Sequence, residues 1–100
     1  MPKQQSSSKQ KSKNNLDEPK KYKVIMHNDD ITTMDFVVDV LMKVFFKTKT
    51  IAKQLMMEIH TQGQAIVGVY SYDIAISKSK KAMALASEKN FPLKLTWSPE

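Results

Sequence analysis

The chain has 100 residues, 41% of them hydrophobic, which is enough for one small domain but not for an elaborate buried active site. Its formal net charge is +6, and the absence of cysteine excludes a disulfide framework and thiolate metal sites. No apolar run approaches the roughly 18 residues that span a membrane, and no secretory signal begins the chain, so we expect a cytoplasmic protein.

Positive charge is concentrated in the first 21 residues. This segment contains six lysines against Asp17 and Glu18, a balance of +4 out of the total of +6. It is rich in Lys, Ser, Gln and Asn and nearly lacks large apolar side chains, so it cannot bury enough surface to fold. We expect a disordered basic extension over residues 1–21 and a folded domain over residues 22–100.

The first elements of the domain are predicted to be a strand and a helix. Residues 22–27, YKVIMH, alternate between two faces, as a strand does. Thr32 is the expected N-cap of the helix, with Asp35 near the positive end of its dipole. Apolar side chains over residues 36–45 recur with helical spacing and form one wide face.

The stretch 47–50, KTKT, interrupts this helical pattern. A second helix follows and is expected to end near Gly63, because glycine suits the left-handed residue after a helix. Residues 65–70, AIVGVY, are rich in β-branched side chains and predict a strand. Gly68 within that strand indicates the close approach of another group.

Ser71 can cap a third helix, which is expected to stop at Asn90 and Pro92. Its predicted buried stripe consists of Ile74, Ala75, Ala82, Leu85 and Ala86. Residues 93–97, LKLTW, alternate as a final strand. The order β-α-α-β-α-β predicts an α+β domain, in which one face of a three-stranded sheet packs against three helices. We favour an antiparallel sheet, with a mixed one as the alternative.

The sequence offers little for catalysis. Cysteine is absent, the two histidines lack a metal-binding spacing, and a glycine-rich phosphate loop is missing. Asp29 and Asp30 lack the further oxygen ligands of a calcium loop. We therefore expect a protein that is not an enzyme and that has no metal site and no cofactor.

Binding of a cationic amine fits the residues better. The turn after the first strand contains Asn28 and Asp29, and His60 can approach it if the first two helices pack side by side. These side chains offer acceptors, whereas an ammonium group has three donors and no acceptor. Four apolar residues of the two helices could line a cavity beside them: Met34, Val37, Met56 and Ile59. Capture of a terminal amine is an established mode of peptide recognition.

Each of these features also has a simpler explanation. An Asn-Asp-Asp run is usually a solvated turn. A single histidine on a helix is more often a core or capping residue, and the four apolar residues would by default belong to the core. The residues alone leave these alternatives open.

Longer segments narrow the choice. YKVIMHNDDITTMDFVVDVL follows the pattern YKVxLxNDDxTPMEFVxxVL, and AKQLMMEIHTQGQAIVGVYSYDIAISK follows A-x-x-x-M-x-x-x-H-x-x-G-x-A-x-x-G. The C-terminal FPLKLTW is similar to a closing HPLxxxxE-like strand. Together these segments, from about Tyr22 to Trp97, resemble the ClpS family of ATP-dependent Clp protease adaptor proteins.

The resemblance implies an N-end rule adaptor. ClpS proteins bind N-degron substrates that begin with Phe, Tyr, Trp or Leu and deliver them to a ClpA- or ClpC-type AAA+ unfoldase for degradation by ClpP. By resemblance, Asn28, Asp29 and His60 bind the substrate's α-amino group. The side-chain pocket is expected to contain Asp30, Thr32, Met34, Val37, Met56, Ile59 and Leu93. Met34 lies at the position thought to reject Ile and Val.

Asp73 and Lys78 match positions implicated in docking the unfoldase's N-terminal domain, and we expect a monomer. Three positions depart from the family pattern: Thr33 replaces a proline, Gln64 replaces a frequent lysine, and Ile76 stands where a charged docking residue is often found.

Two other functions remain open. The chain could be a small basic RNA- or ribosome-associated domain that acts through its lysine-rich tail. All its basic residues are lysine, however, and the bidentate contacts of arginine are missing, which argues against specific nucleic-acid recognition. It could also be a divergent adaptor that keeps the pocket but serves another partner.

Overall fold

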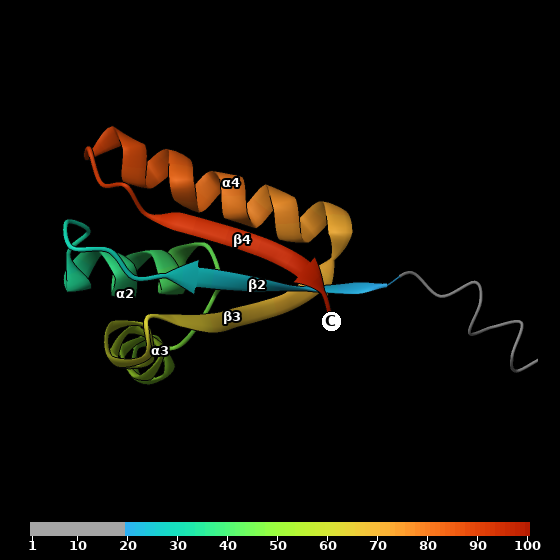
Figure 1. Ribbon diagram of the computed structural model, residues 1–100, viewed down its shortest axis with the longest axis horizontal. Coiled ribbons are helices and arrows are strands. Elements are labelled where there is room, and N and C mark those ends of the chain that lie inside the picture. The colour runs from blue at the N-terminus through green and yellow to red at the C-terminus, as the bar shows by residue number, and fades with distance from the viewer. Residues whose placement is uncertain (1–19) are drawn as a thin grey trace, which may run out of the picture.

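The computed structural model describes residues 20–100. These residues form three strands and three helices (Figure 1) in the order β2 (Lys21–His27), α2 (Met34–Lys43), α3 (Lys49–Gln62), β3 (Gln64–Ser71), α4 (Tyr72–Glu88) and β4 (Lys94–Pro99). The predicted order β-α-α-β-α-β is confirmed. The extension expected over residues 1–21 lies outside the described residues, except for Lys20 and Lys21, and Lys21 already belongs to β2. Among the described residues, no helix is both long and apolar enough to cross a membrane.

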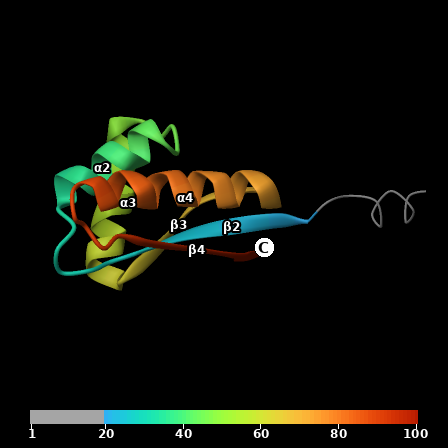
Figure 2. The ribbon, with the colours of Figure 1, turned by 90° about the horizontal axis from the view of Figure 1, so that it is seen from above.

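The three strands form one antiparallel sheet in the order β3-β2-β4, so the predicted antiparallel arrangement is also confirmed. Strand β2 lies in the centre, where Met26 is paired with Ala65 on one side and Leu95 on the other. Its alternate residues Val24 and Met26 are completely buried on one face of the sheet. Figure 2 shows α2 and α4 on the same side of the sheet. The second face of the sheet carries the intervening residues of β2.

The core lies between this face and the helices. Helix α2 contributes large side chains, of which Phe36, Val37, Val40 and Leu41 are buried. Helix α4 contributes small ones, namely Ala75, Ser79, Ala82 and Ala86. Small side chains let a helix backbone approach the sheet closely. The prediction that Ile74 belongs to this buried stripe is wrong, because Ile74 is 48% exposed. It precedes Ala75 by one residue, which turns its side chain about 100° around the helix.

The start of α2 differs from the prediction. Thr33, not Thr32, is the N-cap, and its hydroxyl accepts a hydrogen bond from the backbone N–H of Phe36 at 3.2 Å. The hydroxyl of Thr32 instead donates to the carboxylate of Asp29. Thr32 therefore belongs to the preceding turn, and the helix begins one residue later than predicted.

The predicted close approach at Gly68 is confirmed. A Cβ atom built on Gly68 would collide with the ring and the hydroxyl oxygen of Tyr70, two residues further along β3. Tyr70 is held against the domain, since its ring lies 6.4 Å from that of Phe45. Burial raises the pKa of the Tyr70 hydroxyl. The bare backbone of Gly68 thus makes room for an aromatic ring that packs near the C-terminal end of α2.

We expect Gly68→Ala to lower the free energy of unfolding by about 1–3 kcal/mol, the usual effect of forcing an extra methyl group into a packed site. Urea denaturation of the full chain would measure it. The same substitution in a Tyr70→Leu background should destabilise much less, because the ring that collides has gone. Equal losses in both backgrounds would contradict this account of Gly68.

Candidate functional site

The turn between β2 and α2 is held in one shape by Asp29. One carboxylate oxygen of Asp29 accepts from the backbone N–H groups of Ile31 at 2.8 Å and Thr32 at 2.7 Å. The other oxygen accepts from the Thr32 hydroxyl at 2.7 Å. The backbone N–H of Asn28 donates to the carbonyl of Gly63 at 2.9 Å, which ties the turn to the end of α3. The turn is therefore an Asx-type motif anchored to a second element.

These contacts also set the charge of Asp29. Partial burial acts to raise the pKa of its carboxyl, but the hydrogen bonds from Thr32 and Ile31 outweigh burial and hold the pKa below its ordinary value. Asp29 is therefore ionised at neutral pH. A carboxylate fixed in this way presents negative charge at a constant place.

A pH dependence of stability follows. Because the pKa of Asp29 is lower in the folded chain, its carboxylate stabilises the fold above its unfolded-state pKa of about 4, and this contribution is lost as the pH falls through the lowered value. The difference in unfolding free energy between the unmodified chain and Asp29→Asn should be constant from about pH 8 to 5 and shrink below about pH 4. Urea titrations at several pH values would measure it. A difference that stays constant down to about pH 3 would contradict the role of these hydrogen bonds.

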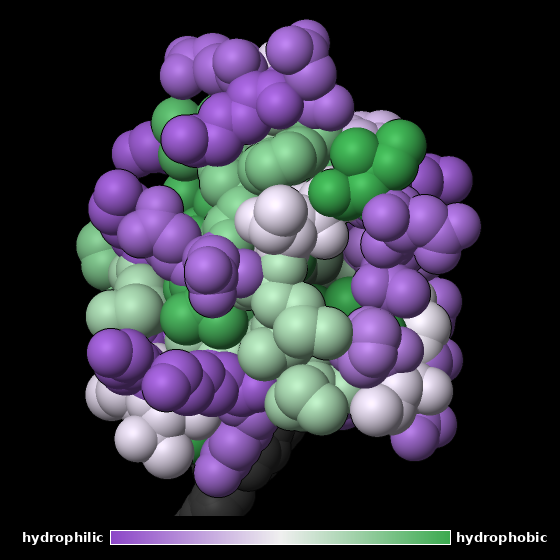
Figure 3. Space-filling view, turned by 90° about the vertical axis from the view of Figure 1, so that its left-hand side faces the viewer, coloured by the Kyte–Doolittle hydropathy of each residue, from purple (hydrophilic) through white to green (hydrophobic). Residues whose placement is uncertain are grey.

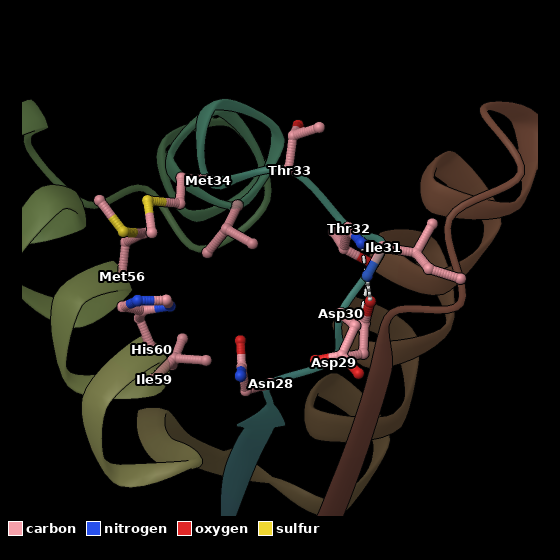
Figure 4. Close-up of a pocket in the computed structure, with 11 residues that line it drawn as sticks. Asn28, Asp29, Asp30, Ile31, Thr32, Thr33, Met34, Met56, Ile59 and His60 are labelled. Atoms are coloured by element: carbon pink, nitrogen blue, oxygen red, sulfur yellow. Dashed lines mark hydrogen bonds between the residues drawn. The ribbon is translucent and has the colours of Figure 1, made fainter.

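The turn forms one side of a cavity of about 400 Å³, which lies between the turn and helices α2 and α3 (Figure 4). Eleven residues line it: Asn28, Asp29, Asp30, Ile31, Thr32, Thr33, Met34, Val37, Met56, Ile59 and His60. Its volume lies within the usual range for small-molecule sites. In the space-filling view of this end of the molecule, exposed hydrophobic side chains are surrounded by hydrophilic ones (Figure 3).

The cavity has a polar and an apolar part. In Figure 4 the side-chain oxygen of Asn28 points into the cavity, and His60 faces it from α3. On the apolar side, Val37 and Ile59 are buried at 7% and 2% exposure and join the cavity to the core. Met34 and Met56 also line this side of the cavity, and Met34 is 43% exposed. The arrangement suits a ligand that has a cationic amine next to an apolar group.

Most of the expected pocket residues come together here. All three candidates for amine binding line the cavity, and so do all side-chain candidates except Leu93. Leu93 is 5% exposed, belongs to the core and is not among the lining residues, so its placement in the pocket is not supported. Ile31 and Thr33 also line the cavity, although neither was among the expected pocket residues. The sequence signal for Ile31 is an apolar residue within an otherwise polar turn. In the structure its side chain is 62% exposed.

The simpler explanations are partly correct. Asp29 does make an Asx turn, and Val37 and Ile59 do belong to the core. His60, however, is exposed, so it is not a core histidine, and Met34 is too exposed for a core residue. Among residues 20–100, no group of three or more His, Cys, Asp or Glu side chains could hold a metal ion.

A second hollow, of about 450 Å³, lies at the other end of α2. It is lined by Val44, Phe46, Asp73, Ile74, Ser77, Lys78 and Lys81, which include both expected docking residues. Phe46 is 78% exposed and adopts a left-handed backbone conformation with φ of 56°, which is uncommon for a bulky residue. Asp73 is exposed on the first turn of α4.

The side chain of Lys78 is held in place by contacts within the domain. Its ammonium group donates to the carbonyl of Val44 at 2.8 Å and lies 4.4 Å from the centre of the Phe46 ring. Partial burial, and then the nearby charge of Lys81, lower its pKa. Since Val44 is the C-cap of α2, Lys78 connects α4 to the end of that helix. It has a structural role in addition to any contact with a partner.

Comparison with known proteins gives consistent matches. The family model described as ATP-dependent Clp protease adaptor protein ClpS matches residues 17–96. An ATP-dependent Clp protease adapter protein ClpS from Acetivibrio thermocellus is 49% identical over 92 residues, which cover 90% of this chain and 93% of that relative. One from Campylobacter jejuni is 54% identical over 78 residues, covering 78% of this chain and 81% of the relative.

A solved structure is similar over most of the described residues. The structure of Agrobacterium tumefaciens ClpS2 bound to L-phenylalaninamide superposes with a TM-score of 0.81 at 43% sequence identity. The match covers 83% of this chain and all of that one. The L-phenylalaninamide bound there combines a free amine with an aromatic side chain.

Proposed function

This chain belongs to the ClpS family of ATP-dependent Clp protease adaptor proteins, and we propose that it recognises proteins with N-terminal Phe, Tyr, Trp or Leu and delivers them to a ClpA- or ClpC-type AAA+ unfoldase for degradation by ClpP. One observation carries this proposal. Amine acceptors from the β2–α2 turn and from α3 meet at a cavity whose floor is apolar. The adaptor binds its substrate without changing it chemically.

The substrate's α-ammonium group is held by Asn28, Asp29 and His60. The amide oxygen of Asn28, the fixed carboxylate of Asp29 and an imidazole nitrogen of His60 supply one acceptor each for the three ammonium donors. An internal residue of a substrate has no ammonium group. The residue that precedes it in the substrate would also collide with these three acceptors. The polar part of the cavity therefore selects a free N-terminus.

The first side chain enters between Met34 and Met56 and ends on Val37 and Ile59. Burying a Phe or Leu side chain contributes about 1.5–3 kcal/mol, and each hydrogen bond to the charged amine adds at most about 1.5–3 kcal/mol. After the cost of association is subtracted, these contributions fit a binding free energy of about −8 kcal/mol, which corresponds to a dissociation constant near micromolar. Phenylalaninamide in the related structure has the same two features, a free amine and an aromatic side chain.

The unfoldase docks at the second hollow, where Asp73, Lys81 and the exposed ring of Phe46 lie together. The two hollows share no lining residue and lie at opposite ends of α2. This helix has 10 residues, so it is about 15 Å long at about 1.5 Å per residue. Substrate and unfoldase can therefore be bound at the same time, as delivery requires.

Variants on α4 separate docking from stability. Asp73→Ala should weaken binding to the unfoldase's N-terminal domain by about three-fold or more, mainly through the loss of a rim charge. It should lower the melting temperature only slightly, because it removes a single exposed charge from the first turn of α4. Lys78→Ala should lower both the affinity for the unfoldase domain and the melting temperature, because it also removes the hydrogen bond to Val44. Calorimetric titration and thermal unfolding would measure the two effects. Asp39→Ala, which removes an exposed carboxylate elsewhere, is the matched control.

Delivery itself is tested by degradation. A fluorescent reporter with N-terminal Phe is incubated with unfoldase, ClpP and ATP, with and without this protein. We expect faster loss of fluorescence with the adaptor, and no acceleration for the same reporter beginning with Ser. Equal acceleration of both reporters, or of neither, would contradict the proposal. Full peptide binding without delivery would indicate an adaptor for another partner.

A further inference from the structure

Two methionines from different helices form the outer wall of the cavity. Met34 is the first residue of α2, and Met56 lies in the middle of α3. Figure 4 shows their sulfur atoms turned toward each other above the space that the substrate's side chain is proposed to occupy. Met34 is 43% exposed and Met56 is half-buried, so solvent reaches this wall when the cavity is empty.

The thioether sulfur atoms of Met34 and Met56 are the groups of the cavity that an oxidant can attack. The chain has seven methionines and no cysteine, so an oxidant meets no thiol that would react first. Met26 is completely buried in the core. Met42 and Met57 are exposed at 37% and 46% but do not line the cavity. The chain therefore contains exposed methionines both inside and outside the proposed site.

We propose that Met34 and Met56 are sites of reversible oxidation by hydrogen peroxide and that their oxidation suppresses substrate binding. The thioether sulfur attacks one peroxide oxygen, the O–O bond breaks, and sulfoxide and water are formed. The sulfur loses two electrons and the peroxide gains them, so the step is balanced. This inference rests on the proposed function of the cavity.

Loss of binding follows from polarity. A sulfoxide turns a flexible apolar side chain into a polar, chiral one. Its oxygen is hydrated in the empty cavity and would lose that water when an apolar side chain enters. Burial of an unpaired polar group of this kind weakens binding by about ten-fold or more. Methionine sulfoxide reductases restore the thioether, with a separate enzyme for each epimer, so the change can be reversed.

The test uses the full chain, hydrogen peroxide and a labelled peptide that begins with Phe and lacks Met, Cys and Trp. Peptide mass spectrometry locates the oxidised methionines, circular dichroism checks the fold, and fluorescence anisotropy gives the affinity before and after treatment. The double variant Met34→Leu/Met56→Leu removes the proposed targets while keeping volume and apolarity. Met42→Leu/Met57→Leu removes exposed methionines outside the cavity and is the matched control.

We expect the unmodified chain and the Met42/Met57 control to lose affinity by about ten-fold on oxidation and to recover it after reduction by the two reductases. The Met34/Met56 variant should change less than about two-fold relative to its own untreated affinity. An equal loss in this variant, unchanged affinity after oxidation at both positions, or resistance of both positions to peroxide would overturn the inference. Failure of the untreated chain to bind the peptide would instead refute the proposed function.

Discussion

Replacing Asp29 by asparagine is expected to weaken binding of a peptide with a free N-terminal Phe by about ten- to a hundred-fold, the range for losing a hydrogen bond to a charged group. The new side chain keeps an oxygen that can accept from the backbone N–H groups of Ile31 and Thr32, so the turn should retain its shape. The negative charge next to the ammonium group is lost, and the new amide N–H₂ would face the Thr32 hydroxyl. The effect should therefore fall on binding more than on folding.

Asp39→Asn is the matched control for this prediction. It makes the same change of charge on the exposed surface of α2, where Asp39 forms an ion pair with Lys43. Exposed pairs of this kind contribute little to stability, and we expect its peptide affinity to stay within about two-fold of the unmodified chain. Equal affinities of Asp29→Asn and Asp39→Asn, with both folded, would contradict the assignment of Asp29 as an amine acceptor.

Replacing Met34 by alanine should have the opposite kind of effect, a gain of substrates. N-terminal Val and Ile carry a branch at Cβ, close to the amine and therefore close to the wall formed by Met34. Removing that side chain relieves the clash, and we expect peptides beginning with Val or Ile to bind about ten-fold more tightly than before. A peptide beginning with Phe should change less, because Met56, Val37 and Ile59 still surround its ring.

Met42→Ala is the control for the Met34 prediction, because it shortens an exposed methionine of the same helix outside the cavity. Anisotropy titrations with peptides that differ only in the first residue would measure all affinities. Since Met34 is 43% exposed, its truncation should leave the fold intact. Unchanged rejection of Val and Ile by Met34→Ala would show that another residue sets this specificity.

The order of elements could be predicted because the sequence signals for single strands and helices are local. Alternation in β2 and the left-handed residue Gly63, with φ of 91°, need no knowledge of the rest of the chain. The amine acceptors could be proposed because Asn28 and Asp29 follow a strand directly. Whether His60 lies beside them depends on how the helices pack. The residues alone could not predict this packing, and His60 was assigned to the amine site by the family resemblance.

Other features depend on contacts that the sequence does not reveal. Thr32 and Thr33 are equally good caps in isolation, and only the bond from Thr32 to Asp29 decides between them. Leu93 and Ile31 are both apolar residues next to a turn, yet the fold buries the first and exposes the second. Lys78 was expected to contact a partner, and its bond to Val44 becomes visible only when α4 packs against the end of α2.

The most direct test of the proposed function compares one labelled peptide beginning with Phe and the same peptide acetylated at its N-terminus, by fluorescence anisotropy. Acetylation removes the positive charge and the donors while leaving the aromatic side chain unchanged. We predict binding of the free peptide with a dissociation constant near micromolar and a loss of at least about ten-fold on acetylation. Equal binding of the two peptides, or binding of neither, would contradict recognition of a free N-terminal amine at this site.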